Sequence, residues 1–95
     1  MSNEEVNEVN IEDIFSSRGR VKVLKTILQL GEVNVTQLIK LTRLNHKVVK
    51  KHIEYLKNLG LIEEIVIGRI KLYRPNWLNP RVKFIDDLMK FIEGY

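Results

Sequence analysis

The sequence of 95 residues predicts a mainly α-helical domain with one small β-hairpin, an α+β fold. Between Ser16 and Leu59, three segments place apolar residues three and four positions apart, the spacing of one helix face. After Gly60 the spacing changes to alternation among β-branched residues, which predicts strands. A last helical segment follows from residue 79. The predicted order is therefore helices, hairpin, helix.

The chain opens on a segment without steady periodicity. Residues 1–10 are polar and rich in Asn and Glu, which predicts a flexible acidic leader. A short turn of helix is expected from Ile11 to Phe15. Ser16 or Ser17 can then cap a longer helix, because a side-chain oxygen satisfies free N–H groups at a helix start, and Gly31 ends it. The apolar stripe of this helix is predicted to comprise Val21, Leu24, Ile27 and Leu28.

Two further helices are expected between Val33 and Gly60. Residues 33–35 form a short extended piece, and Thr36 is the candidate cap of a two-turn helix. After a break at residues 42–45, Asn45 can cap a third helix from His46 to Leu59. The expected buried side chains are Leu38, Ile39 and Leu41 in the second helix and Val49, Ile53 and Leu56 in the third.

Two short strands, residues 61–67 and 70–74, flank the pair Gly68-Arg69. Glycine at the first central position of a two-residue loop favours a tight hairpin. Pro75 ends the second strand because it lacks an N–H donor. Asn79-Pro80 predicts a helix start, since asparagine caps a helix and proline suits its first position.

The charge distribution favours a polyanionic partner. Net charge is +4, but five acids and no Lys or Arg stand in the first 13 residues. The rest of the chain, with all sixteen basic residues and the other seven acids, carries a net +9. Lys and Arg displace counterions condensed on phosphate, so a basic domain behind an acidic leader suits nucleic acid. A merely solvated basic surface stays open on charge alone.

The placement of the lysines favours DNA. Two short helices joined by a tight turn form a rigid corner, and the second helix can enter the major groove. With the apolar stripe of the third helix buried, its opposite face presents Lys47, Lys51, Glu54 and Asn58, with Lys50 at the edge and His46 in the first turn. A structural lysine face usually carries more glutamate at pairing distance. The expected fold is a winged helix-turn-helix with an extra C-terminal helix.

A family resemblance supports this interpretation. The run Val49-Lys50-Lys51-His52-Ile53, continued by Leu56, Leu59 and Gly60-Leu61-Ile62, resembles the recognition-helix signature of ArsR- and MarR-like regulators. Residues 17–24 resemble the first helix of those families, and residues 68–73 resemble their wing. The resemblance covers about residues 16–78. Leu41 and Arg43 depart from it, because those families usually have a small residue and often glycine there, which predicts a looser or differently angled corner.

The resemblance implies roles for individual residues. Arg69 at the wing tip would reach the minor groove, where a guanidinium favours narrow A·T-rich stretches. Helix N-termini attract anions, so the start of the second helix is also expected at the phosphates. Arg18, Arg20 and Arg74 are weaker candidates for phosphate contacts. The predicted DNA-binding residues are Thr36, Gln37, Asn45, His46, Lys47, Lys50, Lys51, Arg69 and Lys71.

The last helix predicts self-association. Its apolar stripe is wide, and packing on the first long helix would hide only part of it. A second copy is the simplest partner for the remainder. We therefore expect a DNA-binding domain over residues 11–78 and a dimerisation helix over residues 79–95. The predicted interface comprises Val82, Ile85, Leu88, Met89 and Ile92.

The sequence indicates no enzyme, cofactor or metal site. His46 and His52 point in different directions on one helix and have no cysteine nearby, since the chain contains none. Asp86 and Asp87 are helix neighbours that do not face each other, and no phosphate-binding loop or nucleophile–His–acid set occurs. No apolar run approaches the roughly 20 residues that span a bilayer, and no signal peptide is apparent. A cytoplasmic location is the expectation, and no effector is indicated.

Three functions are compatible with these patterns. The first is a homodimeric transcriptional regulator with the helix of residues 46–59 in the major groove and the wing of residues 62–74 in the minor groove. The second is an architectural protein of low sequence preference, resembling the small winged-helix chromatin proteins of archaea. The third is a winged-helix protein-interaction module, which the lysines at positions 47, 50 and 51 disfavour.

Overall fold

The computed structural model describes residues 9–95. The predicted acidic leader lies outside the described residues, except for Val9 and Asn10. Val9 is half-buried and packs against the hydrophobic core, so the end of the predicted leader belongs to the fold. Among residues 9–95, no helix is long and apolar enough to cross a membrane.

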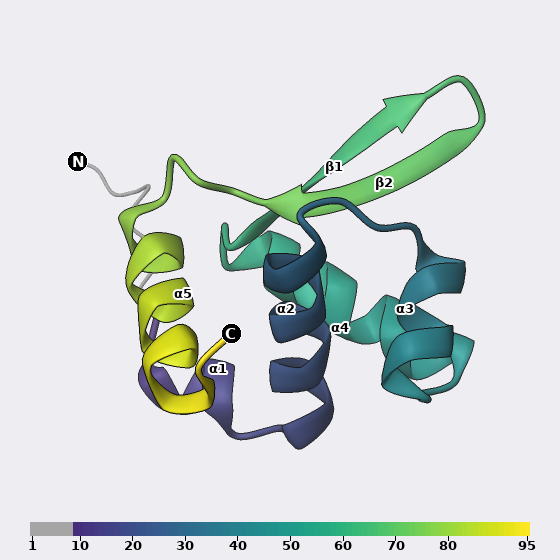
Figure 1. The fold of residues 1–95 in the computed structure, drawn as a ribbon. Helices are drawn as coiled ribbons and strands as arrows, with labels where there is room; N and C mark the ends of the chain where they lie inside the picture. The colour runs from purple at the N-terminus through teal and green to yellow at the C-terminus, as the bar shows by residue number, and fades with distance from the viewer. Residues whose placement is uncertain (1–8) are drawn as a thin grey trace.

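Within residues 9–95, five helices and one hairpin follow in the predicted order (Figure 1). The helices are α1 (Ile11–Phe15), α2 (Arg18–Leu30), α3 (Val35–Thr42), α4 (His46–Asn58) and α5 (Pro80–Glu93). The strands β1 (Ile62–Ile67) and β2 (Ile70–Pro75) pair antiparallel between α4 and α5. The predicted mainly α-helical winged fold with a C-terminal helix is confirmed.

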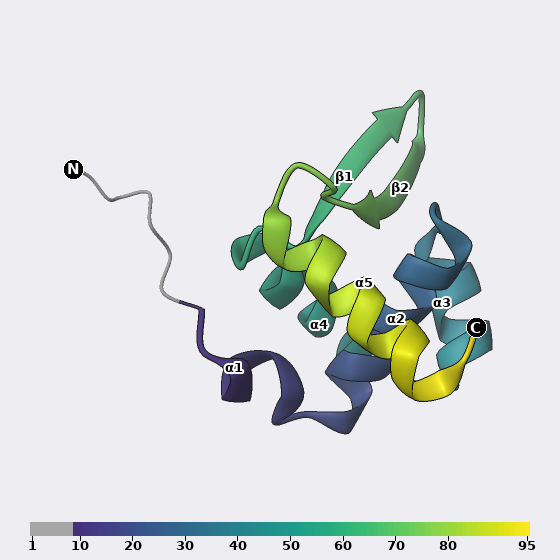
Figure 2. The same ribbon diagram turned by 60° about the vertical axis from the view of Figure 1, so that its left-hand side comes forward.

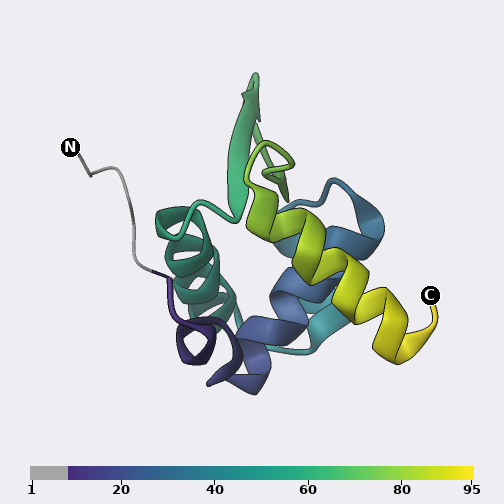
Figure 3. The same ribbon diagram turned by 90° about the vertical axis from the view of Figure 1, so that its left-hand side faces the viewer.

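Helix α2 forms the centre of the molecule, with α3 and α4 packed on it. Figures 2 and 3 show α5 lying across α2 on the side away from α4. One continuous core joins these elements, with Val23, Leu24 and Ile27 from α2 almost fully buried. The stripe predicted for α2 was wrong at one position, because Val21 is only partly buried and Val23 takes its place in the core.

Helix starts follow the capping chemistry of the sequence, with one correction. The Ser17 hydroxyl accepts from the Arg20 N–H at 3.2 Å, as predicted for α2. For α3 the predicted cap Thr36 was wrong: Asn34 accepts from the Gln37 N–H at 2.8 Å, and Gln37 Oε1 accepts from the Asn34 N–H at 2.9 Å. This reciprocal pair is a capping box, and it begins the helix one residue before Thr36.

The hairpin is attached to the helical body along the outer edge of β2 and through the segments that precede and follow it. Val33 and Tyr73 exchange two backbone hydrogen bonds of 3.0 and 2.7 Å, which adds a bridge on the free edge of β2. At the other end, the Asn79 side chain caps α5 and also donates to the Gly60 carbonyl at 2.9 Å. These bonds fix the directions in which the hairpin and α5 leave the core.

Candidate nucleic-acid interface

Helix α4 is fixed by its cap and its buried stripe. The Asn45 side chain accepts from the Val48 N–H at 2.8 Å, which confirms the predicted cap. Val49, Ile53 and Leu56 are fully buried, as predicted. The helix cannot rotate without exposing these three side chains, and burial of each stabilises the fold by roughly 1.5–3 kcal/mol.

The opposite face of α4 is open to solvent. It presents the four side chains predicted for it, Lys47, Lys51, Glu54 and Asn58, while Lys50 is half-buried at its edge. Glu54 pairs with Lys57 at 3.4 Å. No ion pair involves Lys47, Lys50 or Lys51 among residues 9–95, so these ammonium groups are available to an anion.

The corner between α3 and α4 is closed by backbone geometry. Arg43 adopts φ = 62°, the left-handed conformation that glycine accepts most cheaply, and its N–H donates to the Ile39 carbonyl at 2.9 Å. The expected burial of Leu41 was wrong, because its side chain is 52% exposed. Thr42 is buried instead and donates to the Leu38 carbonyl at 2.6 Å. Leu41 therefore does not stand between the helices, and the reason for expecting a looser corner disappears.

The polar residues predicted at the starts of α3 and α4 lie at the surface. Thr36, Gln37, Asn45 and His46 are all exposed. Two of them already use one oxygen internally, since Gln37 Oε1 and Asn45 Oδ1 accept the capping hydrogen bonds. Their amide NH₂ groups therefore remain as donors toward phosphate or base edges.

The hairpin turn has the predicted geometry. Gly68 has φ = 61° and Arg69 does not share the positive φ, which is the pattern of a type II′ turn. Arg69 and Lys71 are exposed near the tip. Arg74 forms an ion pair with Glu63 at 3.0 Å across the strands, so it acts within the hairpin and is less available to phosphate than its sequence position had indicated.

An ion pair connects the end of α4 to the hairpin. Lys57 lies 3.2 Å from Glu64, which stands opposite the buried Tyr73 in the register. The hydrogen bond from Lys57 lowers the pKa of Glu64 and raises that of Lys57 itself. Burial, with the Glu64 charge second, raises the pKa of Tyr73. The link joins the end of α4 to β1, and sequence spacing gave no signal of it.

Comparison with known proteins identifies this architecture. A profile of the bacterial regulatory protein arsR family matches residues 17–64, just over half of the chain. The chain belongs to the arsR family. It is therefore a winged-helix DNA-binding transcriptional regulator and not an enzyme, as predicted. A search of curated proteins gives no significant match.

Solved structures share the fold of this arsR-family chain. Reduced HlyU from Vibrio cholerae is 18% identical with a TM-score of 0.74, covering 86% of this chain and 83% of its own. The transcriptional repressor PagR of Bacillus anthracis is 24% identical with a TM-score of 0.69, covering 80% and 84%. The homodimeric winged helix-turn-helix DNA-binding domain of a possible ArsR-family regulator from Mycobacterium bovis is 18% identical with a TM-score of 0.69, covering 94% and 90%.

Arg20 of the arsR-family chain has a structural position that the sequence did not reveal. Its guanidinium stacks 3.7 Å from the centroid of the Tyr55 ring and donates to the Asp13 carbonyl. Arg20 therefore connects α1, α2 and α4, and its guanidinium is engaged in contacts within the chain. Arg18, in contrast, is exposed. The pair lies 35 positions apart in the chain, so no local pattern could have found it.

His52 is packed at the edge of the core. Its side chain lies between α2 and α4, close to Gly19, where an added Cβ would meet His52 Nε2 at 3.0 Å. Nδ1 has no hydrogen-bond partner among the described residues. Burial lowers the pKa of His52, and the charges of Arg20 and Lys51 lower it further. No group of three His, Asp or Glu side chains within residues 9–95 is placed to hold a metal ion.

The five residues of α5 predicted for dimerisation fall into a buried group and an exposed group. Val82, Ile85 and Met89 are buried in the core of the same chain, because this side of α5 packs on the body of the domain. Leu88 and Ile92 are 46% and 69% exposed, and Phe84 and Phe91 are more exposed still. The free apolar surface of α5 thus consists of Phe84, Leu88, Phe91 and Ile92.

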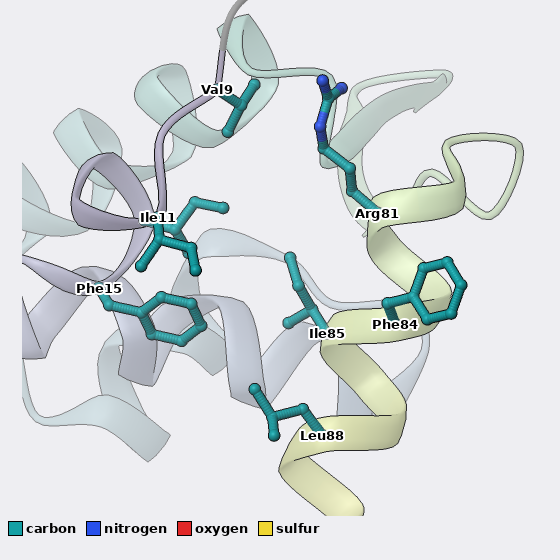
Figure 4. A pocket seen from close by; sticks show the side chains of 8 residues that line it. Val9, Ile11, Phe15, Arg81, Phe84, Ile85 and Leu88 are labelled. Carbon is teal, nitrogen blue, oxygen red and sulfur yellow. The ribbon is translucent and has the colours of Figure 1, made fainter.

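An apolar groove of about 300 Å³ runs between α1 and α5. Figure 4 shows Ile11 and Phe15 of α1 facing Ile85 and Leu88 of α5. Ile11 and Phe84 at its margins are each 73% exposed. The sequence predicted the α5 side of this groove, but it did not predict the contribution of α1.

Proposed function

We propose that this arsR-family regulator binds double-stranded DNA as a homodimer, with α4 in the major groove and the hairpin of residues 62–74 in the minor groove. The observation that carries the proposal is the single exposed face of α4, where Lys47 and Lys51 stand free of ion pairs among residues 9–95. The opposite face of the helix is fully buried, so only this side can meet a ligand.

The contacts follow from the positions of the side chains. A lysine on the first turns of α4 reaches guanine O6 and N7 from the major groove, and Lys50 or Lys51 is the candidate for this role. Lys47 and Lys71, with the side-chain donors of Thr36, Gln37, Asn45 and His46, are assigned to phosphates or nearby base edges. Arg69 at the hairpin tip is assigned to the minor groove.

A second copy is the proposed occupant of the apolar surface on α5 and α1. Exposed apolar patches bordered by polar residues mark interaction sites, and here Phe84, Leu88, Phe91 and Ile92 continue into the groove beside Ile11 and Phe15. A solved structural neighbour is described as a homodimeric DNA-binding domain. Figure 1 shows α5 on the side of the molecule opposite the hairpin tip and α3, so pairing through α5 leaves α4 open.

The test is selection of DNA by the purified full chain from a random pool, followed by competition against genomic fragments. A homodimer with two-fold symmetry should enrich a palindrome whose half-sites lie about 34 Å apart, which is one turn of the DNA helix. It should also prefer that site over random DNA by at least about 10³-fold. Binding without preference beyond a few-fold would favour the architectural role, and absence of binding would reject the proposal.

A further inference from the structure

The tip of the hairpin carries more apolar surface than a solvent-exposed turn requires. Val66, Ile67 and Ile70 are 57%, 59% and 56% exposed. Ile67 and Ile70 are the last pair of the register, directly beside the Gly68-Arg69 turn. Polar residues usually fill such turns, and clustered exposed apolar side chains mark a binding surface.

Ile67 and Ile70 lie on one face of the hairpin, and Val66 lies on the other, beside Lys71. Because side chains alternate along a strand, the pairs Ile67–Ile70 and Ile65–Leu72 lie on the same face. The other face carries Tyr73 and turns into the core. The apolar ladder thus points away from the core, and the Glu63–Arg74 ion pair closes it at its base.

The charge at the tip identifies the partner. Residues 66–71 contain two cations, Arg69 and Lys71, and no acid. Both cations are exposed, and neither has an ion pair among the described residues. In Figure 1 the tip extends to the same side of the molecule as α3, opposite α5. Arg69 lies in the turn beside Ile67 and Ile70, and Lys71 lies on the opposite face of the hairpin. An apolar tip with cations beside it matches a groove of DNA, where base stacks lie between two rows of phosphates.

We propose that Ile67 and Ile70 act as an apolar wedge that enters the minor groove and partly unstacks one base step. Arg69 and Lys71 hold the neighbouring groove wall and phosphates, and the duplex bends away from the hairpin, toward the major groove. This inference rests on the proposed placement of the hairpin in the minor groove. It adds a source of specificity, because pyrimidine–purine steps such as TA and CA unstack most easily.

The test measures bending and unstacking with the full chain on its selected DNA. One duplex carries a donor and an acceptor dye at its ends, and a second carries 2-aminopurine at the step facing the hairpin. The expected result is a bend within the range of about 20–90° and a rise in 2-aminopurine fluorescence on binding. Such wedges favour flexible steps, so replacing the TA or CA step that faces the hairpin by a stiff A-tract should weaken binding.

The matched variants separate the wedge from general binding. Ile67→Thr with Ile70→Thr keeps β-branched residues in the strands, so the hairpin should persist by circular dichroism. It should abolish the bend and weaken binding about tenfold, because apolar contact is exchanged for two hydroxyls. Ile67→Val with Ile70→Val should retain the bend. Arg69→Ala should weaken binding and its salt dependence while some bend remains.

Three outcomes would overturn the wedge. A wild-type complex that binds selected DNA without a bend or a fluorescence change would reject it and leave the proposed function standing. Retention of a full bend by the double threonine variant would also reject it. A change of oligomeric state in that variant would assign the tip to a contact between copies. Absence of DNA binding by the wild-type chain would instead reject the proposed function together with the wedge.

Discussion

Replacement of Lys51 by alanine tests the placement of the DNA surface most directly. Lys51 is exposed on the open face of α4 and makes no ion pair among residues 9–95, so its removal disturbs little in the fold. Each phosphate neutralised by a protein cation contributes about −0.9 to the slope of log K against log salt concentration. The slope therefore counts cations at the interface.

The magnitude follows from the exposed cations of the proposed surface. Lys47, Lys51, Arg69 and Lys71 of two protomers would bring eight cations to the duplex. Each cation displaces counterions whether it meets a phosphate or a base edge between phosphates, so the expected slope is near −7. Such a slope corresponds to about 10⁴-fold weaker binding between 50 and 200 mM salt. Lys51→Ala removes one cation from each protomer, so the slope should become shallower by about 2.

The assay is fluorescence anisotropy of a labelled duplex at a series of KCl concentrations, with unfolding curves to show that stability is retained. Lys83→Ala is the matched control, because Lys83 is an exposed lysine on α5 that pairs with Asp87 at 2.8 Å. Its slope should equal that of the wild-type chain. An unchanged slope in Lys51→Ala, or an equal loss in Lys83→Ala, would refute the assignment of α4 as the DNA-contacting helix.

Three further predictions concern stability and assembly. Burial lowers the pKa of His52 in the folded chain. As the pH falls below about 6.5, His52 is therefore protonated in the unfolded chain before it is protonated in the folded chain. The free energy of unfolding should decrease over this range and level off below the pKa of the folded chain. Urea unfolding between pH 7.5 and 5.5 should show this decrease in the free energy of unfolding, and the decrease should be smaller in His52→Leu. An identical pH dependence in the variant and the wild-type chain would contradict the assignment of the decrease to His52. Arg20→Leu should destabilise the fold by about 1–3 kcal/mol through loss of the Tyr55 stack and the bond to the Asp13 carbonyl. Its affinity for DNA at low temperature should stay unchanged, whereas a drop matching that of Lys51→Ala would make Arg20 a phosphate contact. Leu88→Lys should yield monomers in sedimentation, because a charge in the apolar surface of α5 is costly to bury. Gln29→Lys, on the exposed side of α2, is the control and should leave the dimer intact. A persisting Leu88→Lys dimer would place the interface elsewhere.

Much of the fold is readable from the sequence because it depends on near neighbours. Asn45 caps α4, Gly68 shapes the type II′ turn, and Asn79-Pro80 starts α5 through contacts within a few residues. The buried stripe of α4 follows from a spacing that any amphipathic helix must keep. The exposed lysine face opposite this stripe was predictable for the same reason.

Errors occurred where two patterns competed locally. Thr36 and Asn34 are both good caps, and the reciprocal bonds with Gln37 decided for Asn34. Val21 and Val23 both fit a helical stripe, and the position of α2 against its neighbours decided which one is buried. The sequence contains both alternatives in each case. A local pair of hydrogen bonds ranks the caps, whereas only tertiary packing ranks the valines.

The sequence by itself determined the order of the elements, the caps of α2, α4 and α5, the hairpin turn, and the basic face of α4. The tertiary structure alone decided which cations are free and which apolar residues remain exposed. Arg20 stacks on Tyr55. Val82 and Met89 of α5 are buried, whereas Leu88 remains exposed. The physical reason is that capping and periodicity act over a few residues, whereas ion pairing and burial depend on groups brought together from distant parts of the chain.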